Sequence, residues 1–402
     1  MPDDAPGGPA GTPALAAPSG AGAGGAPAAR APRGRSLLVL TVLVLLVCGS
    51  LSIAAVTMEV GLRGTLPGLL LAAVPVGPVL ATVVWLDRHE AEPPHLLAFA
   101  FGWGACVASL GALVLNSLGS QLLHRAVGDV TNTSVVVAPL VEESLKGLGL
   151  LLVLLLQRRH FDGVVDGVVY AAFVGVGFAY LENVLYLGRA LGAPEGQGAL
   201  VAVFVLRCLV SPFAHPLFTM AVGVGLGLAA SHRSRLVRVV APVAGLVVSV
   251  VLHALWNASA SSGVTTFIEL YLLLQVPVFV AAVGVALAAR SREARLVGRH
   301  LQVYVRTGWL TADEVRTLSS TGGRRLARRQ VARGGGRPAL AALREFHETA
   351  TELAFLRDRA RRGTARPAAG EEAALLERLV ADRAQLLAVL PPPRAPLPPA
   401  PR

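Results

Sequence analysis

Two adjacent carboxylates and a lysine stand inside an apolar stretch of the chain. Glu142, Glu143 and Lys146 lie within residues 134–156, which are otherwise mainly apolar. A run of this length crosses a bilayer as a helix, where each ionisable group costs about 2.5–3.5 kcal/mol on insertion scales. The spacings i,i+3 and i,i+4 bring both carboxylates beside the lysine on such a helix. We interpret this cluster as a functional site, with a buried ion pair between Glu142 and Lys146 as the alternative.

The next three apolar stretches also carry polar side chains. They are Glu182 and Asn183 in residues 164–187, Arg207 and His215 in residues 200–229, and His253 and Asn257 in residues 236–258. At helical rise, Glu142, Glu182 and His253 lie roughly 8–12 Å from the outer end of their spans. The same count places His215 deeper, near the midplane. These depths predict one polar cavity that opens toward the outer surface.

Carboxylates and imidazoles in one pocket can activate water for attack on an amide. Taken singly, His215 and Asn257 are also explained by hydrogen bonds between helices. Arg207 is explained as a partner that neutralises Glu182. The combination of all these groups on four successive spans favours chemistry over packing alone.

The composition indicates which elements hold these groups. The chain has 402 residues, of which 53% are hydrophobic, and a formal net charge of +11. Repeated apolar windows of eighteen or more residues predict an all-α, polytopic membrane protein. The arginines fall mostly in short loops and in the C-terminal region, which is the pattern of membrane orientation. We therefore expect the lipid bilayer as a partner and no nucleic acid. The cysteines, Cys48, Cys106 and Cys208, have neither disulfide-framework nor zinc-site spacing.

About eight transmembrane helices are predicted. They cover residues 37–58, 66–86, 96–115, 134–156, 164–187, 200–229, 236–258 and 266–289. An even number of spans leaves both termini on one side, and the arginine counts assign that side to the cytoplasm. The predicted location is the bacterial cytoplasmic (inner) membrane.

Composition also divides the chain into four regions. They are a disordered tail (1–36), the transmembrane core (37–290), a soluble helical cytoplasmic region (291–390) and a Pro-rich tail (391–402). Amphipathic patterns predict helices at 339–361 and 371–387. Thr311 is the predicted N-cap of a further helix, and Asp166 the predicted cap of the fifth span. The soluble region is thus a small helical appendage.

The polar motifs resemble those of the PrsW-type intramembrane proteases, distant relatives of the CAAX-processing and bacteriocin-immunity membrane proteases. The matching residues are Glu142-Glu143-Ser144-Leu145-Lys146, Asp166-Gly167, Gly175-Val176-Gly177-Phe178, Glu182-Asn183, Arg207 with His215, and His253 with Asn257. The loop from Asp87 to Pro94 is similar to a further element of that family. The resemblance covers about residues 37–290 and implies an intramembrane endopeptidase.

The resemblance also implies residue roles. Glu142 would activate the attacking water, and Glu143 would position or share its proton. His215 and His253 would polarise water or bind a metal, and Asn257 would donate to the oxyanion. The supporting residues are Lys146, Glu182, Asn183 and Arg207.

Two questions about the chemistry stay open. A divalent metal, of which zinc matches best, would be held by His215, His253 and Glu142. A metal-free glutamate mechanism needs the same residues. The implied substrate is a membrane-anchored protein cut in the outer half of the membrane, as in family members that clip an anti-sigma factor.

Two other functions compete with proteolysis. Buried Glu, His and Lys groups also form proton relays in proton-coupled transporters. Such a path must cross the whole membrane, whereas the cytoplasmic halves of the fourth, sixth and seventh spans are apolar. A non-catalytic membrane scaffold that recruits partners through residues 290–390 is the third hypothesis.

Overall fold

The structure, a computed structural model, describes residues 33–86, 92–127, 133–158, 160–363 and 370–390. The tail predicted at 391–402 and residues 1–32 of the N-terminal tail lie outside this described part. Two compact units divide at residue 42, and every contact discussed below lies within residues 43–402. The described residues form helices joined by short turns, with no strand among them, which confirms the all-α fold class.

Six helical stretches of the described chain are long and apolar enough to cross a membrane. They are Ser36–Leu86, Pro94–Leu122, Val164–Gly192, Gln197–Ser231, Arg235–Ser261 and Val264–Arg306. Helix α5 (Thr133–Leu156) differs from these six in composition, because it carries Glu142, Glu143 and Lys146. The chain is therefore a multi-pass membrane protein, and the number of eight spans stays a prediction.

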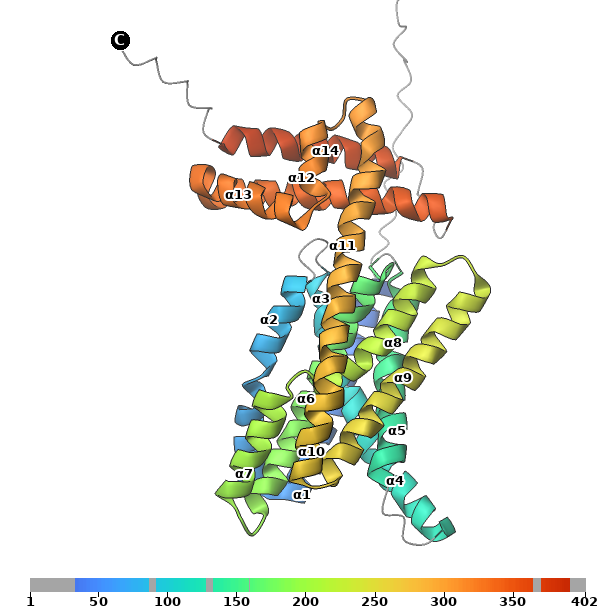
Figure 1. Ribbon diagram of the computed structural model, residues 1–402, viewed down its shortest axis with the longest axis vertical. Helices are drawn as coiled ribbons and strands as arrows, with labels where there is room; N and C mark the ends of the chain where they lie inside the picture. Colours follow the sequence, from blue (N-terminus) through green and yellow to red (C-terminus); the bar gives the residue numbers. More distant parts are fainter. Residues whose placement is uncertain (1–32, 87–91, 128–132, 159, 364–369, 391–402) are drawn as a thin grey trace, which may run out of the picture. The chain divides into compact units, whose positions relative to one another are not determined.

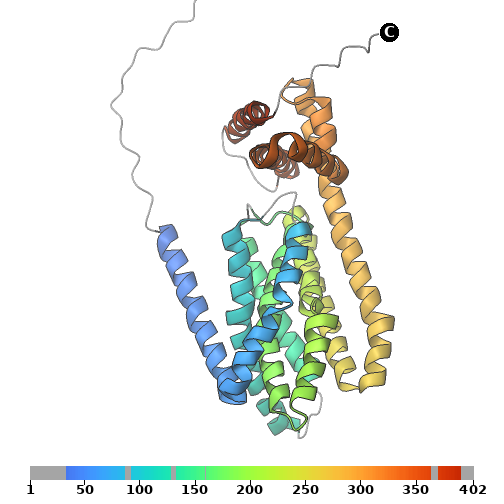
Figure 2. The same cartoon turned by 90° about the vertical axis from the view of Figure 1, so that its left-hand side faces the viewer.

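The first stretch contains a change of direction. Helix α1 (Arg33–Ala73) bends at Gly61, whose φ of 68° lies in the left-handed region that glycine adopts at little cost. The chain then runs back through α2 (Val76–Leu86), as Figure 2 shows. The bend lies between the predicted spans 37–58 and 66–86, so this one stretch covers both.

Helix α6 (Val164–Gly192) is the central helix of the bundle and is buried along most of its length. It is packed against α2, α5, α3 (Pro94–Gly102) and the π-helical turn η1 (Trp103–Ala108), from which the chain continues into α4 (Ser109–Val127). The carboxylate of Asp166 accepts hydrogen bonds from the backbone N–H groups of Asp162 (2.9 Å) and Gly163 (2.8 Å). The predicted cap of this helix is confirmed.

The predicted helix 200–229 is interrupted in the structure. Helix α7 (Gln197–Phe204) and the π-helical turn η2 (Val205–Val210) end before residues 211–213, and α8 (Ala214–Ser231) begins after them. Pro212 lies in the interruption and has no N–H group to continue the helical hydrogen bonds. Irregular backbone at membrane depth is tolerated where it is buried in protein or lines a cavity. This break places His215 in the first turn of α8.

Close backbone packing holds α8 against α6. A Cβ atom added at Gly167 would lie 2.1 Å from the Gly223 carbonyl oxygen, and one added at Gly175 would lie 2.7 Å from the Pro216 nitrogen. Small residues at such contacts let membrane helices approach closely. Helix α9 (Arg235–Ser261) packs on α8 as well, so three helices with polar side chains meet.

The last apolar stretch runs on into the C-terminal region. It consists of α10 (Val264–Leu270), the π-helical turn η3 (Tyr271–Gln275) and α11 (Val276–Arg306). The boundary predicted at residue 290 falls inside α11, so the helix continues from the apolar segment into the charged one (Figure 1). The fourfold division of the chain stays a prediction.

We call the end of α11 together with α12 (Ala312–Leu318), α13 (Thr321–Arg362) and α14 (Glu371–Val389) the appendage. Its own apolar core includes Leu301, Leu318, Leu353 and Leu379. Thr311 caps α12 by accepting a hydrogen bond from the Glu314 N–H (3.2 Å), which confirms that prediction.

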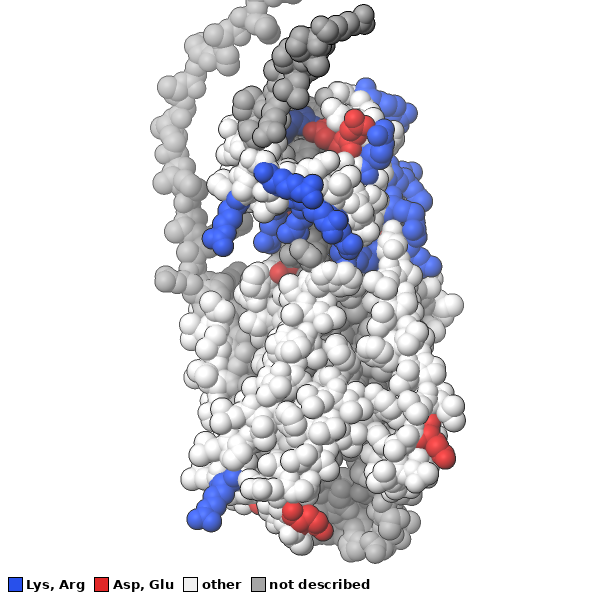
Figure 3. All heavy atoms as spheres, turned by 60° about the vertical axis from the view of Figure 1, so that its left-hand side comes forward, with Lys and Arg blue, Asp and Glu red and all other residues white. Residues whose placement is uncertain are grey.

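Helix α13 is bent at Gly336, which has a φ of 63°. The two arms meet again where the Arg324 guanidinium donates to the Thr351 hydroxyl (2.9 Å). In Figure 3, Lys and Arg side chains gather on the appendage and where it meets the apolar bundle, whose visible face is almost without charge. This distribution is consistent with the orientation predicted from the arginine counts.

Candidate functional site

Glu143 is the most completely bonded carboxylate of the site. One oxygen accepts hydrogen bonds from the hydroxyls of Thr219 on α8 (3.0 Å) and Ser249 on α9 (2.7 Å). The other lies 2.8 Å from Lys146 Nζ and 2.9 Å from His253 Nδ1. The side chain is fully buried, so these bonds replace its water. Glu143 therefore joins three helices and has little capacity left for another ligand.

Lys146 extends this network to the sixth predicted span. Its ammonium group lies 2.9 Å from His215 Nδ1, 3.7 Å from the Glu142 carboxylate and 3.8 Å from the centre of the Phe178 ring. An ammonium group can only donate, so Nδ1 of His215 is the acceptor. The Nε2–H of His215 is then left to donate to the Glu182 carboxylate, 2.7 Å away.

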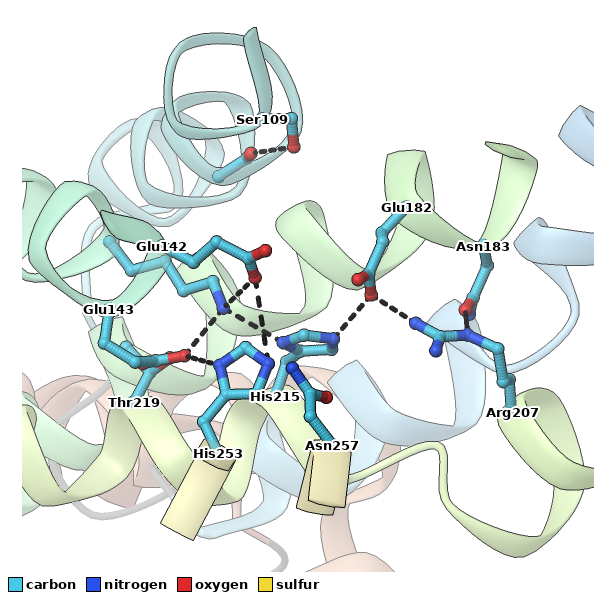
Figure 4. A network of polar contacts seen from close by, with 12 residues as sticks. Ser109, Glu142, Glu143, Glu182, Asn183, Arg207, His215, Thr219, His253 and Asn257 are labelled. Atoms are coloured by element: carbon cyan, nitrogen blue, oxygen red, sulfur yellow. Dashed lines mark hydrogen bonds and ion pairs between the residues drawn. The ribbon is translucent and has the colours of Figure 1, made fainter. Parts of the chain in front are cut away.

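Glu182 also pairs with the Arg207 guanidinium, the partnership that the sequence indicates. Arg207 Nε donates to the Asn183 side-chain oxygen (2.7 Å), and the guanidinium lies over the Tyr186 ring. Figure 4 shows the resulting chain of contacts from Glu143 to His215, Glu182 and Arg207. The four supporting residues of the sequence prediction thus belong to one network.

Glu142 differs from its neighbour, because one of its oxygens is buried without a hydrogen-bond partner among the described residues. This oxygen, Oε2, lies 3.7 Å from the Lys146 ammonium group and 3.8 Å from His253 Nε2. In the neutral imidazole whose Nδ1–H donates to Glu143, Nε2 carries the lone pair. A carboxylate oxygen and an imidazole nitrogen therefore face one another with lone pairs to offer.

The two imidazoles are neighbours. The rings of His215 and His253 lie 5.1 Å apart at an angle of 89°, and Phe218 stacks on His253. His215 therefore lies beside His253, and its depth in the membrane stays a prediction. The depth count assumed a continuous helix from residue 200, whereas the chain is interrupted at 211–213.

A polar cavity of about 270 Å³ reaches Glu142. Its lining includes Glu182, Asn257 and Asn116, and the exposed ion pair of Arg189 and Glu59. Asn257 Nδ2 donates to the Ser134 carbonyl at the start of α5 (2.8 Å), so this amide also joins α9 to α5. The cavity therefore connects the Glu142 side chain with the surface.

Sequence reasoning missed several residues of the site. Asn116 on α4 donates to the second Glu142 oxygen (3.2 Å), and Thr219 and Ser249 hold Glu143. A signal was present for two of them: Thr219 follows His215 by four residues, and Ser249 precedes His253 by four. Asn116 lies just beyond the predicted end of the third span, so only the fold brings it to the site.

The charges of the site do not cancel. With both imidazoles neutral, the carboxylates of Glu142, Glu143 and Glu182 face two cations, Lys146 and Arg207. Buried charges are stable only when they are compensated, so this site attracts one further positive charge. A proton or a metal ion can supply it.

The donor set fits a metal ion. Glu142, His215 and His253 each offer a ligand atom, and the three atoms lie within 4.8 Å of one another. Two imidazoles and one carboxylate form the ligand set of a catalytic zinc site with an open position. The Glu142 oxygen without a hydrogen bond and Nε2 of neutral His253 are the nearest donors for such an ion. His215 can join them when it gives up its contact with Lys146 or Glu182.

Comparison with known proteins shows a family to which the middle of the chain is similar. Residues 92–282 match the family described as PrsW family intramembrane metalloprotease, and this range contains Glu142, Glu143, His215 and His253. Over this range, which is just under half of the chain, the chain is similar to the PrsW family. Protease PrsW of Clostridioides difficile (strain 630) is 32% identical over 150 residues, which cover 36% of this chain and 60% of that protein.

Protease PrsW of Bacillus subtilis (strain 168) is 28% identical over 228 residues, which cover 56% of this chain and 96% of that protein. No solved structure matches the chain. The match to the C. difficile relative thus spans less than two thirds of that protein. The PrsW family match ends at residue 282, so the appendage lies outside it.

Proposed function

We propose that this chain is an intramembrane endopeptidase that hydrolyses peptide bonds of membrane-associated protein substrates. One observation carries the proposal: Glu142 lines a polar cavity, and its oxygen without a hydrogen bond lies between the Lys146 ammonium group and His253 Nε2. Hydrolysis of an amide needs a group that takes a proton from water and groups that stabilise the oxyanion. The PrsW family description supports this reaction type.

We assign Glu142 to the attacking water and Glu143 to positioning. Glu142 Oε2 can accept a water proton, whereas Glu143 is occupied by four partners on α5, α8 and α9. Glu143 holds His253 in the tautomer that turns Nε2 toward Glu142. Lys146 balances the charge of the pair.

We assign the oxyanion to the groups that line the same cavity. Asn257 Nδ2 has two hydrogens and uses one on the Ser134 carbonyl, which leaves one for a substrate oxygen. Glu182 and Arg207 hold His215 from the other side. This division makes Glu142, His215, His253 and Asn257 the substrate-facing residues.

A metal ion would be held by Glu142, His215 and His253, and zinc suits this donor set best. When bound, the ion would supply a Lewis acid that lowers the pKa of its water and polarises the scissile carbonyl. Glu143 would then be the carboxylate that orients the ligand His253 through Nδ1–H. The same residues without a metal form a glutamate-dependent site, so the metal content of the protein separates the two mechanisms.

We further propose that the site acts in the membrane half that is remote from the appendage, because the cavity to Glu142 reaches the surface beside Glu59 and Arg189. By the arginine distribution, the appendage is cytoplasmic and the cut lies in the outer half of an inner membrane. A membrane-anchored regulator, such as an anti-sigma factor, has the required topology.

Membrane proteomics in the host tests the proposal. Cells with the wild type should contain a truncated membrane protein that accumulates at full length with Glu142→Gln. Glu195→Gln, which changes a glutamate outside the site, is the matched control and should cleave normally. An unchanged set of membrane-protein termini in the Glu142→Gln cells, with normal insertion of the variant, would contradict the proposal.

In the part of the chain that the structure describes, a largely apolar layer argues against the transporter hypothesis. Between the site and the appendage end of the bundle, α5, α6 and α8 contact one another through buried apolar side chains that include Leu150, Val169 and Val222. A proton relay needs polar groups across this layer. We therefore do not propose transport.

A further inference from the structure

A second cavity with one sign of charge lies where the appendage meets the apolar bundle. It encloses about 630 Å³ between α2, α11 and both arms of α13. Its lining holds six arginines: Arg290, Arg324, Arg325, Arg328, Arg329 and Arg344. Glu348 is the only carboxylate among the described residues that line it, and it pairs with Arg344. We call this the basic cavity.

The arginines of the basic cavity cannot relieve their repulsion by losing protons, because a guanidinium stays charged in proteins. Arg324 is buried and is held by the Leu318 carbonyl (2.9 Å) and the Thr351 hydroxyl, which fixes one charge in place. Arg290 lies over the Trp85 ring, 4.7 Å from its centre, which fixes a second. Planar guanidinium groups arranged in this way suit phosphate oxygens.

An apolar groove adjoins the basic cavity. Trp85 and Leu287 line both, and the groove of about 160 Å³ continues between α2, α8 and α11 past Ala282 and Phe213. It is lined almost wholly by apolar side chains. Tryptophan is typical of the level at which lipid headgroups meet acyl chains.

We propose that the basic cavity and the groove form one binding site for an anionic phospholipid, with the phosphate among the arginines and an acyl chain along the groove. A soluble phosphate compound would bind to the arginines but would leave the apolar groove empty. A zwitterionic lipid would fill the groove but leave the excess positive charge. Basic pockets between membrane helices and a cytoplasmic region are known to suit anionic headgroups.

A lipid in this site would contact both the appendage and the apolar bundle. The arginines belong mainly to α13 of the appendage, whereas Pro216 and Leu217 of the groove follow His215 directly in α8. This proposal does not depend on proteolysis. Binding is measured without substrate, so its failure and the failure of the protease proposal are distinguishable.

Native mass spectrometry of the full-length protein in nonionic detergent tests the site, with palmitoyl-oleoyl phosphatidylglycerol, the matching phosphatidylcholine and inorganic pyrophosphate as probes. We expect phosphatidylglycerol to bind at least about tenfold more tightly than phosphatidylcholine. Arg325→Gln with Arg329→Gln should weaken that binding about 25-fold, at roughly fivefold for each arginine. Arg333→Gln with Arg337→Gln removes the same charge from α13 outside the cavity and should leave binding within about twofold.

A second pair of variants tests the groove. Ala282→Trp fills the groove and keeps every arginine, so it should weaken phosphatidylglycerol at least about tenfold, whereas Ala288→Trp on the exposed side of α11 should not. This pair decides the matter if the arginine variant does not fold.

Three results would overturn the proposal. They are equal binding of the two lipids to the wild type, equal losses from the two arginine pairs, and full binding of phosphatidylglycerol to Ala282→Trp. Displacement of the lipid by pyrophosphate at similar concentration would likewise assign the cavity to a soluble phosphate.

Discussion

The buried site and the basic cavity both collect charged side chains beside apolar helices, but they hold them in different ways. In the site, carboxylates, imidazoles and cations alternate, and among its described side chains only Glu142 and Asn116 keep a buried oxygen without a hydrogen bond. In the basic cavity, charges of one sign face a common space. Alternating charges position a reactive group, whereas charges of one sign prepare a place for a ligand of the opposite sign.

The two regions therefore differ in how strictly their function depends on the positions of their side chains. The site rests on contacts of 2.7–3.0 Å around Glu143, so small displacements should be costly. Arg325 and Arg329 of the cavity are exposed and can adjust to a ligand. Substitutions in the site should therefore act on the reaction, and substitutions in the cavity on binding.

The largest effect is expected at Glu142. Replacement by Gln keeps the size of the side chain but removes the proton acceptor, so cleavage should fall by about 10²–10⁴-fold. Initial rates of product formation in proteoliposomes measure it. Thermal stability should change little, which separates loss of chemistry from loss of fold. A variant with more than about half of the wild-type rate would remove Glu142 from its assigned role.

The second-largest effect is expected on the metal content of the purified protein. We expect close to one divalent ion per purified wild-type chain, and a fall to nearly none in His253→Ala, because two of the three donors cannot hold the ion. Inductively coupled plasma mass spectrometry measures this without any substrate. His232→Ala, which changes a histidine outside the site, is the control. Full activity in metal-free wild-type protein would instead support the glutamate mechanism with the same residues.

A smaller effect on rate and stability is expected where α6 packs closely against α8. A Cβ at Gly175 would lie within 3.0 Å of backbone atoms of His215 and Pro216, so Gly175→Ala must displace the first turn of α8. We expect about a tenfold lower rate and roughly 1–3 kcal/mol lower stability. Gly192→Ala at the end of the same helix meets open space and should match the wild type in both measurements. Equal behaviour of the two variants would show that the position of His215 tolerates movement.

The smallest expected effect is on the pH dependence of stability and comes from His347, which lines the basic cavity. Burial, together with the charges of Arg324 and Arg328, lowers the pKa of His347 to about 3. The unfolded chain, with a pKa near 6.5, therefore binds a proton between about pH 6.5 and 3 that the folded chain does not, and stability falls as the pH falls through this window. Between pH 7.5 and 5.5 the wild type should lose about 1 kcal/mol more unfolding free energy than His347→Gln. Parallel stability curves would contradict a buried neutral imidazole.

The sequence predicts the regular parts of this molecule well. The predicted span 134–156 corresponds to α5, the appendage pattern 371–387 lies within α14, and the caps at Asp166 and Thr311 are present. These features depend on local periodicity and on side chains that bond to nearby backbone. The pairing of Arg207 with Glu182 was predictable because an isolated buried charge needs a partner.

The remaining features depend on contacts between distant segments. The interruption at 211–213 is hidden because both flanks are apolar, and average hydropathy does not detect a missing hydrogen bond at Pro212. Threonine and serine are common in membrane helices, so residue type alone does not mark Thr219 and Ser249 as part of a site. Only the fold places their hydroxyls beside Glu143. The basic cavity needs the bend of α13 at Gly336, which brings Arg324 and Arg344 to the same space.

The most direct test of the central claim uses a membrane-anchored substrate in proteoliposomes prepared in H₂¹⁸O. Hydrolysis by the wild type should place one ¹⁸O atom in the new C-terminal carboxylate of the product, and Glu142→Gln should form almost no product. The Glu195→Gln control should give the wild-type label and rate. Equal cleavage by the wild type and Glu142→Gln, or a product without ¹⁸O, would contradict the assignment of Glu142 to the attacking water.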